Sequence, residues 1–111
     1  MSLESHLAVD VTDGTVEFAF TVENTGTESI DLEFPSGKSV DVAVYDDGTE
    51  IWRWSEGRMF TQALRTEMIA PGESIRRVVT WNDPRSGTYT AVASLEAANE
   101  NLVERAAFTV P

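Results

Sequence analysis

The sequence TVEFAFTVEN, residues 15–24, alternates apolar and polar side chains over eight consecutive positions. The apolar face consists of Val16, Phe18, Phe20 and Val22, and the intervening residues are Glu17, Ala19, Thr21 and Glu23. A period of two residues is typical of a β-strand that buries one of its faces. The stretch therefore predicts a strand whose valines and phenylalanines pack in a core.

Strand-forming residues also dominate on both sides of this stretch. Val, Ile and Thr together number 28 of the 111 residues, and β-branched side chains favour extended backbone over helix. Further strands are expected at residues 7–11, 30–34, 40–45, 51–54, 64–68, 75–81, 89–95 and 103–110. Turn sequences such as Asp13-Gly14 and Asp46-Asp47-Gly48 separate them. Residues 96–101 are too few for a stable helix of their own, so no helix is predicted.

About 7 to 9 short strands at intervals of roughly 8 to 12 residues predict an all-β fold. Within about 100 residues, this spacing indicates an immunoglobulin-like antiparallel β-sandwich, with a small barrel as the alternative. The length fits a single domain over residues 1–111. Tyr89 follows Gly87-Thr88, and we expect its hydroxyl to fix the start of a strand by a hydrogen bond to the backbone.

The sequence has no recognisable transmembrane segment, secretory signal or cysteine, and this indicates its cellular compartment. No apolar run approaches the roughly 20 residues that cross a bilayer, so no membrane association is expected. The first six residues, MSLESH, carry an acid where a secretory signal needs basic residues. The absence of cysteine excludes disulfides, thiolate metal ligands and a cysteine nucleophile. We therefore expect a cytoplasmic protein.

The chain is strongly acidic, with 19 acidic and 8 basic residues and a net charge of -11. Nucleic acid is a poor candidate partner, because its binding depends on neutralising phosphates with Lys and Arg. Scattered carboxylates with a single lysine, Lys38, are typical of proteins from salt-rich cytoplasm, where salt screens the repulsion between the carboxylates. We expect a halophilic source; an acidic mesophilic domain is the alternative.

No catalytic, cofactor-binding or metal-binding residue is predicted. The only histidine, His6, is expected on the surface of an edge strand, and a nucleophile triad needs a histidine or another base beside its Ser or Thr. A zinc site needs three or four converging ligands, and the soft ligands are missing. Asp46, Asp47 and Glu50 surround Gly48 in a plain turn, without the ligand pattern of a calcium loop.

The segment IWRWSEGRMFTQ, residues 51–62, is the least typical of a simple β-domain. It holds two of the three tryptophans together with Arg, Met and Phe, which are types enriched where proteins bind one another. One interpretation places Trp52 and Phe60 in the core and leaves Trp54 partly covered. The other makes Trp54, Arg58, Met59 and Phe60 a partner-binding patch on an exposed corner.

Several pieces of the sequence, in this order, resemble one known family. They are FTVENT (20–25), IDLEFPSG (30–37), VDV (40–42), GTEIWRWS (48–55), MF (59–60), PGE (71–73) and GTY (87–89). Together they are similar to the intracellular proteinase inhibitor BsuPI family. The resemblance implies a BsuPI-like immunoglobulin-like sandwich and, by analogy with the named member, inhibition of an intracellular subtilisin-like serine protease. The alternative is a non-inhibitory cytoplasmic protein-interaction module; an enzyme is the least favoured class.

Overall fold

The computed structural model describes residues 2–111 as nine β-strands. In chain order they are β1 (Leu3–Thr12), β2 (Thr15–Asn24), β3 (Ile30–Phe34), β4 (Val40–Asp46), β5 (Thr49–Arg53), β6 (Arg65–Ile69), β7 (Ser74–Asn82), β8 (Gly87–Leu95) and β9 (Val103–Val110). Among residues 2–111 there is no helix of the length and apolarity that crossing a membrane requires. The all-β prediction is confirmed.

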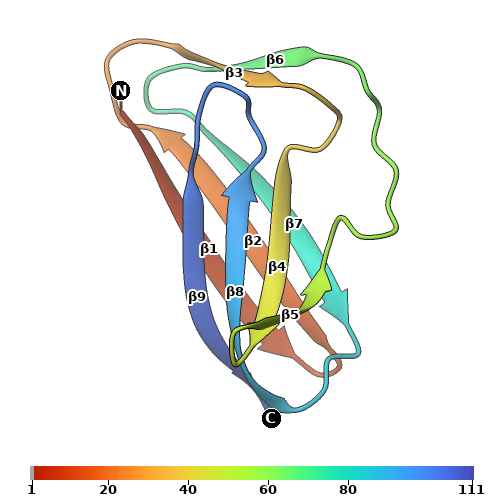
Figure 1. Ribbon diagram of the computed structural model, residues 1–111. Coiled ribbons are helices and arrows are strands. Elements are labelled where there is room, and N and C mark those ends of the chain that lie inside the picture. Colours follow the sequence, from red (N-terminus) through yellow and green to blue (C-terminus); the bar gives the residue numbers. More distant parts are fainter. Residues whose placement is uncertain (1) are drawn as a thin grey trace.

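The strands form an antiparallel immunoglobulin-like sandwich, so the alternative of a small barrel is wrong. One sheet has the order β1-β2-β7 and the facing sheet has the order β5-β4-β8-β9. In Figure 1 the two sheets lie one behind the other, and the short β3-β6 pair crosses the end of the molecule where the N-terminus lies. The C-terminus lies at the opposite end.

The core lies between the two sheets, as the alternation in residues 15–24 predicts. All four apolar residues of that stretch are buried, and they form one cluster with inward residues of β4, β8 and β9. Phe18 stacks on Trp52 at 6.0 Å between ring centroids, and Trp52 stacks on Trp81 at 5.6 Å. Phe108 meets Phe18 edge-on at 5.6 Å. Burying each such side chain contributes roughly 1.5 to 3 kcal/mol, so this aromatic stack is a principal source of stability.

The β4-β5 hairpin contains an irregularity that matters for the site. Its turn, Asp47-Gly48, has positive φ at both residues, 50° and 84°, as a two-residue hairpin turn requires. The register then shifts between Val44 and Tyr45, so that β5 carries an extra residue. Residues three apart on a regular strand face opposite sides, but the bulge places both Glu50 and Arg53 on the outer face.

Two local predictions have different outcomes. The Tyr89 hydroxyl donates to the backbone oxygen of Arg85 at 2.7 Å, which confirms its structural role at the start of β8. The strand expected at residues 64–68 runs instead over Arg65–Ile69. Leu64 lies outside the observed strand and is 82% exposed, and Met68 is 63% exposed, whereas Ile69 enters the core.

Candidate functional site

The candidate site is the connection between β5 and β6, residues 54–64, which we call the 54–64 loop. It leaves the edge of one sheet and runs along the side of the sandwich to the β3-β6 pair (Figure 1). Its first part is a turn, in which Glu56 N donates to Arg53 O and Arg58 N donates to Ser55 O, both at 3.1 Å. Residues 58–64 have no regular secondary structure. The loop thus presents an irregular segment beside two sheets.

The four residues of the predicted patch are adjacent, but their exposure differs. Trp54 and Phe60 are half-buried, with their rings 5.6 Å apart. Arg58 covers Trp54, its guanidinium carbon 4.8 Å from the ring centroid, and its Nε donates to Trp54 O at 2.8 Å. Met59 is 98% exposed. Trp54 is partly covered, as the first interpretation expected, but Phe60 is not part of the core, so that placement is wrong. Arg58 and Met59 face solvent.

The near end of the loop is held by a buried carboxylate. Asp41, on β4, is only 2% exposed. Its Oδ1 accepts hydrogen bonds from the backbone N of Ser55 at 3.2 Å and of Val42 at 2.9 Å. Its Oδ2 accepts from Ser55 Oγ at 2.7 Å, Arg53 Nη1 at 3.0 Å and Lys38 Nζ at 3.4 Å. One side chain therefore fixes the end of β5 and the first turn of the loop.

These contacts keep Asp41 ionised. Burial alone would raise its pKa, but hydrogen bonds from Ser55 and Arg53 and the charges of Lys38 and Arg53 outweigh burial and lower the pKa. Arg53 also binds Glu50, Nη2 to Oε1 at 2.7 Å, and this hydrogen bond lowers the pKa of Glu50. The bulge in β5 makes the Glu50–Arg53–Asp41 chain possible, because it brings both Glu50 and Arg53 to the outer face.

The far end of the loop is fixed against Gly37. The backbone N of Gly37 donates to Thr61 O at 2.9 Å. A Cβ atom at position 37 would lie 2.7 Å from Thr61 Oγ1, closer than real Cβ contacts come. Phe60, the preceding residue, lies beneath Lys38, whose Nζ is 6.0 Å from the ring centroid. The segment that carries Met59 is thus held on both sides.

Asp41 is the residue that the sequence did not single out. It sits between Val40 and Val42 as one polar position of an alternating strand, just as Asp31 and Glu33 do in β3. Only the register of β4 with β5 brings Ser55, fourteen residues later, to its carboxylate. His6 is exposed on the edge strand β1, where the sequence predicted it.

Known structures share the fold of this chain at low sequence identity. The CARDB domain of the PF1109 protein from Pyrococcus furiosus, solved in complex with di-metal ions, is 21% identical with a TM-score of 0.53, over 98% of this chain and 92% of that one. β-Glucosidase 3B from Thermotoga neapolitana, solved with glucose, is 17% identical with a TM-score of 0.53, over 98% of this chain and 16% of its own. A β-glucosidase from Kluyveromyces marxianus is 16% identical with a TM-score of 0.53, over 99% of this chain and 14% of its own.

These likenesses concern the fold alone, and this chain spans only about a sixth of the β-glucosidase chains. A comparison with curated protein sequences finds no significant match. The sequence model of the BsuPI family, described as an intracellular proteinase inhibitor, matches residues 3–100 of the 111. The chain belongs to the BsuPI intracellular proteinase inhibitor family.

Proposed function

We propose that this protein inhibits a subtilisin-like serine protease in the cytoplasm by placing the 54–64 loop in the active-site cleft. The family supports a proteinase inhibitor and, by its description, an intracellular one. The observation that carries the proposal is Met59, which is 98% exposed in a segment anchored on both sides. The role is one of binding, not of catalysis.

The loop has the form that a protease cleft accepts. Residues 58–64 are free of regular hydrogen bonding between strands and follow a turn that projects them from the sheet edge. An exposed methionine is flexible and apolar, and it suits an apolar specificity pocket. Arg58 and Phe60 flank it, the first exposed and the second packed on Trp54. In this arrangement Met59 enters the pocket while its neighbours stay attached to the sandwich.

Anchoring explains how an inhibitor without cysteine binds tightly. A flexible loop loses conformational entropy when it binds, and holding it in the bound conformation beforehand removes much of that cost. Many small inhibitors use disulfides for this purpose, but this chain has none. The Asp41–Ser55 hydrogen bonds at one end and the Gly37–Thr61 contact at the other provide the restraint here.

The test is a titration of a subtilisin-like protease with the full chain, following residual activity and the integrity of the chain by mass spectrometry. Molar potassium chloride is the appropriate medium, because the composition predicts a halophilic source. We expect saturable loss of activity at about one chain per protease, with the chain uncut. Met59→Asp is expected to weaken inhibition at least about 100-fold, the effect of losing a central anchor.

Met68→Asp is the matched control. It places the same charge at another exposed methionine, 63% exposed on β6 and outside the loop. We expect this variant to inhibit like the wild type. Equal inhibition by wild type and Met59→Asp would refute the assignment of the loop. Undiminished activity with several subtilisin-like proteases would instead favour the alternative of a non-inhibitory cytoplasmic interaction module.

A further inference from the structure

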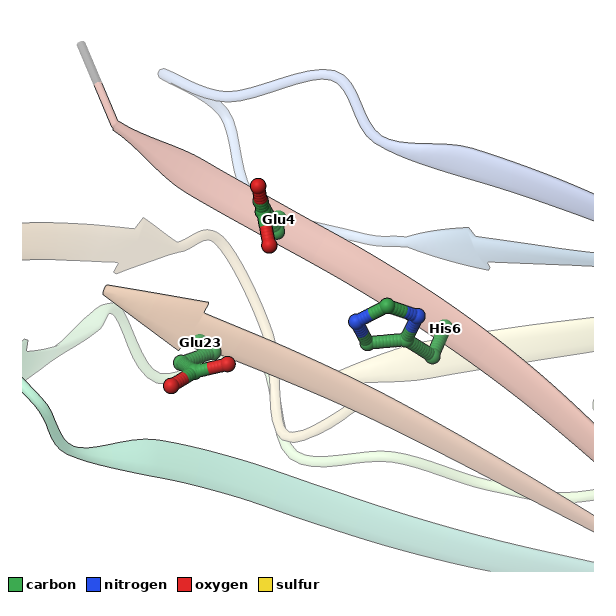
Figure 2. A group of neighbouring side chains, drawn as sticks. All are labelled: Glu4, His6 and Glu23. Carbon is green, nitrogen blue, oxygen red and sulfur yellow. The ribbon is translucent and has the colours of Figure 1, made fainter. Parts of the chain in front are cut away.

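A second cluster of side chains lies on the outer face of the β1-β2-β7 sheet, away from the 54–64 loop. Glu4 and Glu23 are directly paired in the register of β1 with β2, and His6 lies two residues along β1 on the same face. Figure 2 shows the three side chains, with the His6 ring pointing along the strands toward the end where Glu4 and Glu23 lie. One ligand atom from each residue lies within 4.8 Å of the other two.

These three groups match the ligand preferences of a divalent transition metal. Imidazole nitrogen and carboxylate oxygen both bind Zn²⁺ at about 2.0 to 2.2 Å. In a tetrahedral site, the ligand atoms around one such ion lie roughly 3.5 Å apart. Rotations of the side chains that move these atoms by about 1 Å therefore bring the three ligands to this spacing. An imidazole ligand favours zinc and its neighbours over Mg²⁺ and Ca²⁺, which prefer oxygen alone.

The local charge also favours a cation. Like charges directly opposed across two strands repel each other, and Glu4 and Glu23 form such a pair. No ion pair found among residues 2–111 involves either glutamate or His6. By strand register, the nearest basic residue on this face is Arg76 on β7. Thr21 on β2 pairs with Arg76 on one side and with His6 on the other. Thr21 therefore separates Arg76 from the cluster along the register.

We propose that Glu4, His6 and Glu23 form a binding site for a divalent transition metal, with Zn²⁺ as its representative ion. The metal joins the edge strand β1 to β2 and removes the repulsion between the two glutamates. With three protein ligands on an exposed face, water completes the coordination. The sequence predicted no metal residue, because His6 and Glu23 are seventeen positions apart and only the β1-β2 register brings them together.

The test uses the full chain, freed of metal with a chelator and titrated with ZnCl₂ in a calorimeter. We expect one saturable site per chain and a rise in the thermal unfolding midpoint on zinc addition. His6→Ala is expected to abolish both effects, and Glu4→Gln and Glu23→Gln to weaken zinc binding at least tenfold. All three positions are at the surface or half-buried, and metal-free unfolding midpoints near that of the wild type verify that the variants fold.

Glu17→Gln is the matched control. Glu17 pairs with Asp10 on the same two strands and the same face, an opposed acidic pair with no histidine beside it. We expect this variant to bind zinc like the wild type. The proposal is overturned if zinc does not bind saturably. It is also overturned if His6→Ala binds zinc as well as the wild type, or if Glu17→Gln weakens binding as much as Glu23→Gln does.

Discussion

The carboxylate of Asp41 and the carboxylates of Glu4 and Glu23 have opposite surroundings. Asp41 is buried and accepts hydrogen bonds from Arg53, Lys38 and Ser55. Glu4 and Glu23 face each other across two strands at the surface, without a basic partner among the ion pairs of residues 2–111. A buried charge needs fixed partners, whereas an exposed pair can be neutralised by an ion from solution.

The difference shows where this acidic chain uses its few basic residues. Four of the eight lie in the 54–64 loop or contact its supports. Lys38 and Arg53 bind Asp41, Arg58 covers Trp54, and Arg65 directly follows the loop and donates to Gly37 O at 3.5 Å. The loop that we propose binds the protease is therefore held in place by lysine and arginine side chains of the same chain.

The largest expected effect comes from removing Asp41. Asp41→Ala removes the buried acceptor of five hydrogen bonds, from Lys38, Val42, Arg53 and twice from Ser55, so we expect the free energy of unfolding to fall by about 3 kcal/mol. Denaturant unfolding measures it. We also expect the loosened loop to inhibit poorly and to be cut by the protease. Asp31→Ala, at an exposed position of β3, is the control and should change stability by less than about 0.5 kcal/mol; an equal loss in both variants would contradict the account.

The second effect tests the other end of the loop. Gly37→Ala forces a Cβ against Thr61 Oγ1, and we expect a loss of about 1 to 3 kcal/mol in unfolding free energy as the loop shifts. Thr61→Ala removes that oxygen, so the double variant should recover most of the loss. A double-mutant cycle measures the coupling. If the two substitutions are simply additive, Gly37 and Thr61 do not restrain the loop together.

A third effect follows from the titration of Asp41. Burial alone would raise its pKa, but its partners lower the pKa below the ordinary 3.8. A carboxyl with a depressed folded pKa stabilises the protein above its unfolded pKa, and this contribution is lost as the pH falls through the folded value. We expect the stability difference between wild type and Asp41→Asn to stay constant from pH 7 to about 5 and to shrink below about pH 4. Unfolding at pH 7, 5 and 3 measures it, and a difference unchanged at pH 3 would be inconsistent with this role.

The smallest effect belongs to the exposed pair. In metal-free protein, Glu23→Gln relieves its repulsion with Glu4, and we expect it to stabilise the fold by about 0.5 kcal/mol. With zinc present the sign should reverse, because the variant loses a ligand. Thermal unfolding with chelator and with zinc compares the two conditions. The same sign in both would mean that Glu23 acts only through its charge.

The strands with one buried face, such as β2, β3 and β8, were predictable from the alternation of their apolar residues. Residues 15–24 show the clearest alternation, and their four apolar side chains are all in the core. The prediction was less accurate at β6, where Met68 is exposed and the neighbouring Ile69 is buried, so an apolar residue alone did not mark the inner face. The Tyr89 hydrogen bond was predictable because it spans four residues.

The candidate sites were only partly predictable. The composition of residues 51–62 drew attention to the loop, since Trp, Arg, Met and Phe are concentrated there. The contacts that form both candidate sites depend on strand registers, which cannot be read from the sequence. Asp41 reaches Ser55 through the bulged β4-β5 register, and Glu4 reaches Glu23 through the β1-β2 register. Nothing local distinguishes these acids from the other carboxylates of an acidic chain.

The most direct test of the central claim asks where Met59 lies in a complex with the protease. A photo-crosslinking amino acid is placed at position 59, or at position 68 as the control, and the crosslinked peptides are identified by mass spectrometry after mixing with a subtilisin-like protease. We predict that position 59 crosslinks to residues lining the specificity pocket and that position 68 does not. Crosslinks from position 68 alone, or from position 59 only to surfaces remote from the cleft, would contradict the account.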